Sequence, residues 1–274
     1  ENICRIANNN GIYTINSFFD RDVVDKIVNS KGKADIVTAF NVFAHADNLK
    51  SIVDNAFILL KENGVFIVEV QYVLDTLKDV TFDNIYHEHV NYWSVTSLNE
   101  FCRLNNFNLM KVEHVDTHGG SIRAYIGTSA EIDSSVKIFL NQEEDFGICE
   151  FSTYEKFAND VKNLKTSVLK TVSKIKREGK SIVGYGSPAK ATTVLNYYGI
   201  SYEDIDYIIE DNELKHNHFL PGMKIPIRSK NDALKEIPDY ILVLAWNFLD
   251  DIKLNNPDLV KSGCKFVTLR DLNW

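Results

Sequence analysis

Cysteine is scarce in this chain, and its cysteines never lie close together. The four are Cys4, Cys102, Cys149 and Cys264, spread across 274 residues. Zinc sites of the usual kind use closely spaced pairs of cysteine or histidine ligands, which these cysteines do not form. Disulfide bonds belong mainly to oxidising compartments. The scattered cysteines therefore favour a reduced, cytoplasmic protein with no metal site in this sequence.

An excess of positive charge and long apolar runs are also lacking. The net charge is −8 at pH 7, so neither nucleic acid nor an anionic membrane surface is expected as the main partner. No apolar run is long enough to cross a bilayer, and we recognise no signal peptide. The remaining composition, 45% hydrophobic and 25% charged, is typical of a globular protein with about two domains.

The first part of the chain alternates helices and strands, which predicts a parallel sheet covered by helices on both faces. A doubly wound domain normally opens with a strand and a glycine-rich turn, whereas this one opens with a helix. We therefore expect a domain without its first strands. The predicted elements are a helix over 1–10 closed by Gly11, a strand Ile12–Phe18, a helix 21–29, a strand Asp35–Phe40, a helix 47–61 closed by Asn63-Gly64, and a strand Val65–Val70.

Further along, the pattern becomes antiparallel. A helix over 97–104 precedes the predicted strands Asn108–Val115 and Ser121–Gly127, and Gly119-Gly120 lie between the two strands. This fits an antiparallel pair that completes the sheet. Parallel strands followed by a terminal hairpin resemble the fold of S-adenosylmethionine-dependent methyltransferases, an analogy that concerns topology alone.

A long helix and a second α/β unit follow. Apolar residues recur at three- and four-residue steps from Tyr154 to Ile175, which predicts a packed connecting helix. Beyond Gly179, four short apolar strands and a helix near Ala189 predict a smaller Rossmann-like domain. We expect an α/β protein with a methyltransferase-type domain at 1–130, a helical connector at 131–179 and a C-terminal domain at 180–274.

The densest chemistry lies in the run Phe82-Asp-Asn-Ile-Tyr86-His87-Glu88-His89. Imidazoles dominate proton transfer near neutral pH. His45 follows an earlier strand, and the carboxyl ends of parallel strands face one crevice, so we expect His45, Tyr86 and His89 to converge. The alternatives are a polar strand edge and, for His45, a cap on the helix near Asp47. In an extended run His87 would point away from its neighbours, which makes it structural.

A second signal is the turn Gly184-Tyr-Gly186-Ser-Pro-Ala-Lys190. Its two glycines permit a tight turn, the following helix directs free N–H groups to any ligand there, and Lys190 offers a cation to a phosphate. Glu210-Asp211 end the next strand, where a dinucleotide fold places a ribose-binding acid. The third glycine of that fingerprint is replaced by Ala189, so phosphate is favoured over NAD, and geometry alone also explains the glycines.

Three further residues are candidates for substrate binding. Arg123 begins a strand after Gly119-Gly120 and could reach a phosphate, or it is an exposed strand-edge arginine. Trp246 and Asn247 follow an apolar strand, where the indole either stacks on a base or packs. The loop with Lys215, His216 and His218 predicts no metal site, because a third ligand at useful spacing is missing.

Together these runs resemble the sugar C-methyltransferases, which methylate a ring carbon of nucleotide-linked keto-deoxysugars. The resemblance covers nearly the whole chain in order. It implies S-adenosylmethionine as the methyl donor, a nucleotide-linked sugar as partner, and a plan of zinc module, methyltransferase domain and C-terminal sugar-nucleotide domain. The matching stretches are Asn41–His45, Phe82–His89, His118–Arg123, Gly184–Lys190, Leu220–Pro226 and Leu244–Asn247.

The resemblance also assigns roles. It makes His89 the general base, lets Glu88 orient groups in the site, and has Tyr86 and His45 position the sugar or hydrogen-bond the enolate oxygen. The substrate-binding candidates are Arg123, Gly184, Gly186, Lys190, Trp246 and Asn247.

The sequence departs from the family plan at its start. The zinc module and the glycine-rich loop that cradles S-adenosylmethionine are absent, so zinc and most of the donor pocket are expected outside it. The chain is then a fragment, is completed by another chain, or is degenerate. Two other functions stay open: a non-catalytic sugar-nucleotide-binding protein, and an NAD-dependent oxidoreductase that uses the Gly184 turn. The sugar, its nucleotide, the methylated carbon and the oligomeric state cannot be read from the sequence.

Overall fold

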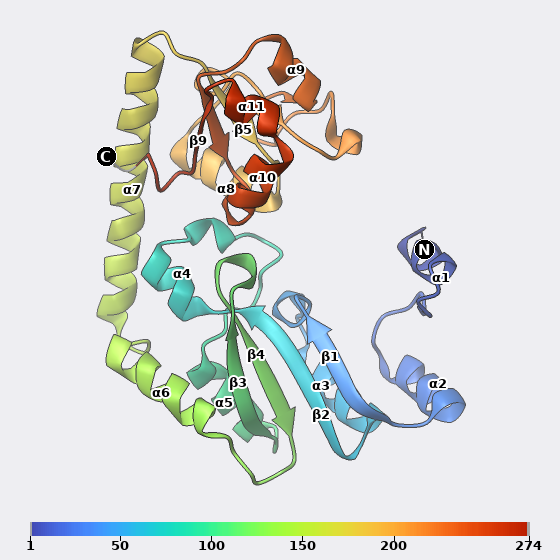
Figure 1. Ribbon diagram of the computed structural model, residues 1–274. Helices are drawn as coiled ribbons and strands as arrows, with labels where there is room; N and C mark the ends of the chain where they lie inside the picture. The colour runs from blue at the N-terminus through green and yellow to red at the C-terminus, as the bar shows by residue number, and fades with distance from the viewer. Residues whose placement is uncertain (1, 273–274) are drawn as a thin grey trace. The chain divides into compact units, whose positions relative to one another are not determined.

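The computed structural model describes residues 2–272, which form two compact units (Figure 1). The first unit holds the residues up to Val73 together with Val90–Phe146, and the second holds Leu74–His89 and the residues from Gly147 onward. These units do not follow the expected boundaries at 130 and 179. The segment Leu74–His89, which carries the Tyr-His-Glu-His run, belongs to the second unit, and the expected connector is divided between the two.

The first unit is built on a four-stranded sheet in the order β1-β2-β4-β3. Strands β1 (Ala34–Phe40) and β2 (Leu60–Gln71) are parallel, and β4 (Ser121–Gly127) pairs antiparallel with both β2 and β3 (Asn108–Val115). The predicted antiparallel pair is therefore confirmed, with β4 inserted between β2 and β3. Helices α1 (Asn2–Asn9) and α2 (Arg21–Lys31) precede the first strand, and α6 (Ser134–Phe146) follows the last one. Between the strands lie α3 (Leu49–Leu59), α5 (Val95–Leu104) and the short 3-10 helices η1 (Phe43–His45) and η3 (Thr117–Gly119).

Two predictions about the first unit are wrong. Residues 12–18 are not a strand, because their backbone makes local hydrogen bonds, such as Ser17 N–H to the Ile15 carbonyl, where a strand needs a neighbour. Helix α3 ends at Leu59 and β2 begins at once at Leu60, so Asn63-Gly64 lie inside the strand. The pairing of β1 with β2 jumps between Ala34 and Ile36, and a bulge accommodates the turn-forming residues there.

The second unit contains a five-stranded parallel sheet in the order β7-β6-β5-β8-β9. Its strand order reverses between β5 and β8, where open α/β sheets form a crevice at the carboxyl ends of the strands. The strands are β5 (Ile182–Tyr185), β6 (Ile208–Ile209), β7 (Ile227–Arg228), β8 (Tyr240–Val243) and β9 (Lys265–Val267). The helices are α4 (Val73–Asp79), η2 (Phe82–Asn84), α7 (Phe151–Arg177), α8 (Ala189–Tyr198), η4 (Glu213–Lys215), α9 (Lys230–Lys235), η5 (Trp246–Phe248), α10 (Leu249–Asn255) and α11 (Pro257–Lys261).

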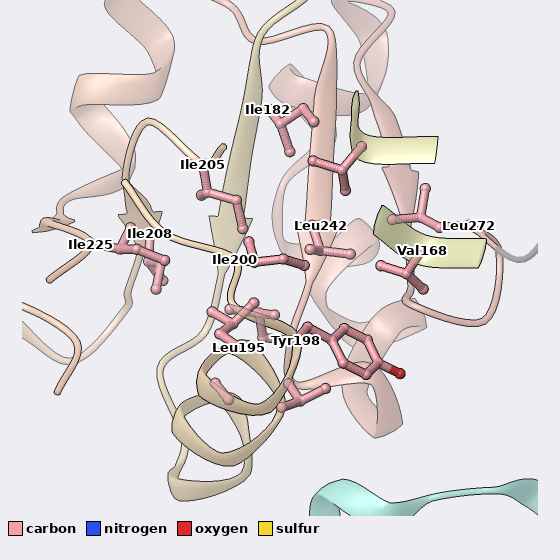
Figure 2. Close-up of a cluster of buried hydrophobic side chains, with 14 of the residues drawn as sticks. Val168, Ile182, Leu195, Tyr198, Ile200, Ile205, Ile208, Ile225, Leu242 and Leu272 are labelled. Carbon is pink, nitrogen blue, oxygen red and sulfur yellow. The ribbon is translucent and has the colours of Figure 1, made fainter. Parts of the chain in front are cut away.

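The core of the second unit joins the long helix α7 to the sheet and to α8. Figure 2 shows Val168 of α7 among strand residues Ile182 and Leu242 and the α8 residues Leu195 and Tyr198. Phe82 belongs to the same cluster, and its ring centroid lies 5.2 Å from that of Tyr197 and 5.5 Å from that of Tyr198. The segment that leads into the Tyr-His-Glu-His run is thus anchored in this core. Among the residues described, no helix is long and apolar enough to span a bilayer.

Removing the Phe82 ring is expected to destabilise the second unit. Phe82 is 9% exposed, and large-to-small substitutions at such positions cost about 3–5 kcal/mol. Phe82→Ala should lower the free energy of unfolding by roughly that amount in urea titrations followed by circular dichroism. Phe219→Ala is the matched control, because Phe219 is 62% exposed. Equal losses in the two variants would contradict the anchoring of this segment.

Candidate active site

The Tyr-His-Glu-His run forms a tight turn and not the extended segment that we predicted. The His89 N–H donates to the Tyr86 carbonyl at 3.0 Å, which closes the turn. The turn places the two side chains together, with Tyr86 Oη 2.9 Å from His89 Nε2 and ring centroids 4.2 Å apart. The expected proximity of Tyr86 and His89 is therefore present, and the turn is its cause.

The other ring nitrogen of His89 fixes its tautomer. His89 Nδ1 lies 2.8 Å from the backbone carbonyl oxygen of Asn84, which can only accept a hydrogen bond. Nδ1 therefore carries the hydrogen, and in the neutral ring the lone pair is on Nε2. The Tyr86 hydroxyl then donates to Nε2. This arrangement presents a half-buried imidazole whose basic nitrogen points at a phenol.

The remaining two residues of the turn are exposed. His87 Nε2 lies 3.9 Å from Glu88 Oε1, and the two side chains are 84% and 57% exposed, so their attraction is weak. His87 is placed edge-on to Tyr86, with ring centroids 6.4 Å apart. The argument from an extended run does not apply to His87, although its side chain does face solvent.

Asp83 holds the start of this segment against the C-terminal sheet. It is 6% exposed, and its Oδ2 accepts a hydrogen bond from Trp246 Nε1 at 2.7 Å. Two cations lie near the Trp246 ring, with Lys190 Nζ 4.3 Å and the Arg270 guanidinium 5.1 Å from its centroid. Lys190 also donates to Asn247 Oδ1. The predicted residues Lys190, Trp246 and Asn247 thus lie together, and Trp246 binds a buried carboxylate of the chain itself.

Burial opposes both charges of this cluster. It raises the pKa of Asp83, while the Trp246 hydrogen bond and the charges of Lys190 and Arg270 act against the rise. It lowers the pKa of Lys190, with the Asp83 carboxylate acting in the other direction. Sequence reasoning missed Asp83 and Asn84, whose signal was two polar residues between buried Phe82 and the Tyr-His-Glu-His turn.

The glycines of the Gly184 turn are required by geometry. A Cβ on Gly184 would come within 2.9 Å of Ile208, and Gly186 has φ +83° with Ala245 at 3.0 Å from a built Cβ. The hydrogen-bond donors of Ser187 in this turn are already paired with a carboxylate of the chain. Ser187 donates from its backbone N–H (2.9 Å) and its hydroxyl (2.5 Å) to one oxygen of Glu210.

The Glu210 carboxylate is held there as an ion. Burial raises its pKa, but hydrogen bonds from Ser187 and Asn212 outweigh burial and lower the pKa overall. Lys215 Nζ lies 3.6 Å from the same carboxylate. A cavity of about 340 Å³ beside the turn is lined by the carboxylates of Glu210, Asp211 and Asp251, with Lys215 as a cation. An external phosphate at this turn would have to displace Glu210.

Arg123 and His45 lie in the first unit. Arg123 is half-buried in β4, and its Nη2 lies 2.7 Å from Oε2 of the buried Glu69 on β2. It is therefore a paired arginine inside the sheet and not an exposed edge residue. His45 ends η1 and is exposed. The following helix is capped by Asn48, whose side chain accepts from Ser51 N–H at 3.0 Å, so His45 is not its cap. Within residues 2–272, no three or more histidine, cysteine or acidic side chains are grouped to hold a metal ion.

Asp83→Asn should change how stability depends on pH. The folded-state pKa of Asp83 is raised above its ordinary value of 3.8. The protonated carboxyl therefore stabilises the fold below pH 3.8, and this stabilisation is lost as the pH rises through the folded-state pKa. Asparagine keeps an oxygen for Trp246 without this titration. The unfolding free energy of the variant minus that of the wild type should therefore become more positive from about pH 4 to pH 7, measured by urea unfolding. The attraction between Lys190 and the ionised carboxylate is already part of that folded-state pKa.

Asp232→Asn is the control of opposite sign. The pKa of Asp232 is lowered, chiefly by its hydrogen bond with Lys235, so the same difference should become more negative as pH rises through about 4, the ordinary pKa of aspartate, and should then level off. A pH-independent difference for Asp83→Asn would show that burial does not perturb this carboxyl.

Comparison with known proteins agrees with the sequence resemblance. The family model of the C-methyltransferase C-terminal domain matches residues 116–269, and a methyltransferase domain matches residues 1–112. The C-methyltransferase NovU from Streptomyces niveus is 32% identical over 269 residues, which are 97% of this chain and 64% of NovU. The chain therefore spans somewhat under two thirds of the length of this relative.

Two solved methyltransferases align with part of the chain. The O-methyltransferase NcsB1 from neocarzinostatin biosynthesis is 14% identical, with a TM-score of 0.33 over 46% of this chain and 37% of its own. The magnesium protoporphyrin IX methyltransferase of Synechocystis PCC 6803 is 15% identical, with a TM-score of 0.28 over 38% and 48% of the two chains. The match to the C-methyltransferase C-terminal domain covers more than half of the residues of this chain, and the chain therefore belongs to the C-methyltransferase family.

Proposed function

We propose that this chain carries the acid–base machinery of an S-adenosylmethionine-dependent C-methyltransferase. Its substrate would be a nucleotide-linked deoxysugar, methylated at the carbon next to a ketone. The observation that supports this most is the Tyr86–His89 pair, in which a tautomer fixed by the Asn84 carbonyl directs the basic Nε2 toward the phenol. The alternative, a non-catalytic sugar-nucleotide-binding protein, has no need for an imidazole fixed in this way.

Carbon methylation beside a ketone requires removal of a proton from carbon. His89 Nε2 is the proposed acceptor, and the C–H electron pair forms the enolate. His89 then carries hydrogens on both nitrogens, and the Nδ1 hydrogen stays on the Asn84 carbonyl, which holds the ring in place. The Tyr86 hydroxyl turns from Nε2 to the enolate oxygen and donates to it, which stabilises the developing charge. Glu88 stays a proposed orienting group at the rim of the turn.

S-adenosylmethionine, when bound, supplies an electrophilic methyl group. In this chain its adenosine would meet the carboxyl end of β1, where ligands bind in parallel sheets. Asn41 follows β1 with φ 55°, and Phe40 and Val42 are 43% and 56% exposed. An amide beside exposed apolar side chains suits a nucleoside. His45 follows directly and is proposed to reach the sugar. Zinc, expected in a module outside this sequence, stays a prediction.

The NAD-dependent alternative loses its main support at the Gly184 turn. A dinucleotide fold uses the donors of this turn for a pyrophosphate. Here Glu210 accepts from both donors of Ser187, and the adjoining cavity is lined by carboxylates. Arg123 is likewise paired with Glu69. We propose that Lys190, Trp246 and Asn247 serve the substrate by positioning the Phe82–His89 segment.

His89→Asn is the direct test, made in the full-length enzyme. Positioned acid–base groups contribute about a hundred- to ten-thousandfold in rate, so turnover should fall in that range while affinity for the nucleotide-linked sugar changes little. Exchange of the substrate's α-hydrogen into deuterated water, followed by NMR without the methyl donor, should be suppressed as well. Tyr86→Phe should slow turnover less, because it removes one hydrogen-bond donor.

His218→Asn is the control, since it changes an exposed histidine of the same unit that does not belong to the turn. Full α-hydrogen exchange in the His89 variant would assign the proton transfer to another residue. A loss of sugar binding equal to the loss of turnover would mean that His89 only maintains the site.

A further inference from the structure

A cavity of about 480 Å³ lies beside the Tyr86–His89 pair, entirely within the second unit. It is lined by Tyr86 and His87, by residues of α8 and by Pro221-Gly222. Its volume is in the range that small-molecule sites occupy, about 300–1,000 Å³. The function proposed above uses Tyr86 but leaves this cavity without an occupant.

The cavity face of α8 is polar but uncharged. Ala189, Thr192, Thr193 and Asn196 recur at steps of three and four residues and line the cavity, while Val194, Leu195 and Tyr198 are buried in the core on the other side. Lysine, arginine and acidic side chains are absent from the described lining. Neither threonine hydroxyl has a hydrogen-bond partner within residues 2–272, although both side chains are partly buried. Such a surface can hydrogen-bond a neutral polyhydroxyl ligand, and it supplies no lysine or arginine to pair with a phosphate.

Asn196 presents a fixed acceptor. Its Nδ2 donates to the carbonyls of Thr192 at 2.8 Å and Pro221 at 3.0 Å, so both amide hydrogens are used and the orientation of the amide is set. Gly222 has φ +83°, and a Cβ there would come within 1.8 Å of Asn196 Oδ1. Only glycine leaves room for this oxygen, which accepts no hydrogen bond within the described part of the chain. The Pro221-Gly222 turn thus maintains an acceptor beside the cavity.

We infer that this cavity is the sugar-ring subsite of the enzyme, an inference that rests on the proposed function. Asn196 Oδ1 accepts from a ring hydroxyl, and the Thr192 and Thr193 hydroxyls bond to neighbouring ones. The ring's ketone then meets Tyr86, while the diphosphate stays outside the uncharged pocket. These three α8 residues determine which pattern of hydroxyls the enzyme accepts, because a polar group left unpaired in the pocket costs binding energy.

Thr192→Val and Thr193→Val test this, because valine keeps the shape of threonine and removes the hydroxyl. The probes are the thymidine and uridine diphosphate forms of a keto-deoxyhexose, each compared with its free nucleoside diphosphate by calorimetric titration of the full-length enzyme. Each variant should weaken binding of the sugar form about 2- to 10-fold, as expected for one neutral hydrogen bond, and leave the free diphosphate unaffected. Thr166→Val on the exposed face of α7 is the control. KM should rise with kcat nearly constant.

The outcomes separate the two proposals. Equal weakening of sugar and free diphosphate would assign the cavity to the nucleotide, and no weakening would exclude it as a ligand site. Either result overturns the subsite while His89→Asn still tests the function. If the wild-type enzyme binds neither sugar form, both proposals fail together.

Discussion

The hydrogen bond from Trp246 to Asp83 is the interaction on which the arrangement of the candidate site depends. It joins residues 163 positions apart and lies beside Phe82, which is buried in the same unit. Phe82 and Asp83 together fix the start of the segment Phe82–His89, which contains no strand. The Asn84 carbonyl then orients the imidazole of His89. A side chain on an eight-residue run is held precisely only because its supporting residues belong to a packed domain.

The second unit has the outline of a nucleotide-binding fold, but its glycine turn binds a side chain of the protein. The glycine turn, the following helix and the acid at the end of the next strand are all present, yet the acid bonds to the turn itself. The fold therefore does not determine the ligand. In this chain the Glu210 carboxylate occupies the position at which dinucleotide-binding folds hold an external anion. The lysine that such a turn would offer a phosphate is directed instead to Asn247 and the indole of Trp246.

Local patterns predicted the elements whose causes are local. Strands β3 and β4 could be placed because period-two apolar residues flank a glycine pair, and the α8 helix because it follows a glycine-containing turn. Asn63-Gly64 misled the prediction, since a turn signal can also be absorbed as a bulge inside β2. The turn at Tyr86–His89 contains neither glycine nor proline, so its closure had no sequence signal. Contacts such as Arg123 with Glu69 and Trp246 with Asp83 depend on strand register and tertiary packing, which no local window contains.

The assignment of Leu74–His89 to the second unit has a consequence for how such enzymes exchange parts. The chain passes between the units at residues 73–74, 89–90 and 146–147, so the second unit is discontinuous in sequence. A recombination event that transferred only the stretch from Gly147 onward would bring a new pocket without the turn that matches it. The residue opposite Asp83, which is Trp246 in this chain, and the core around Phe82 would then come from a different protein. The packing of the second unit is therefore encoded in two separated stretches of sequence, and a change in one stretch is constrained by the other.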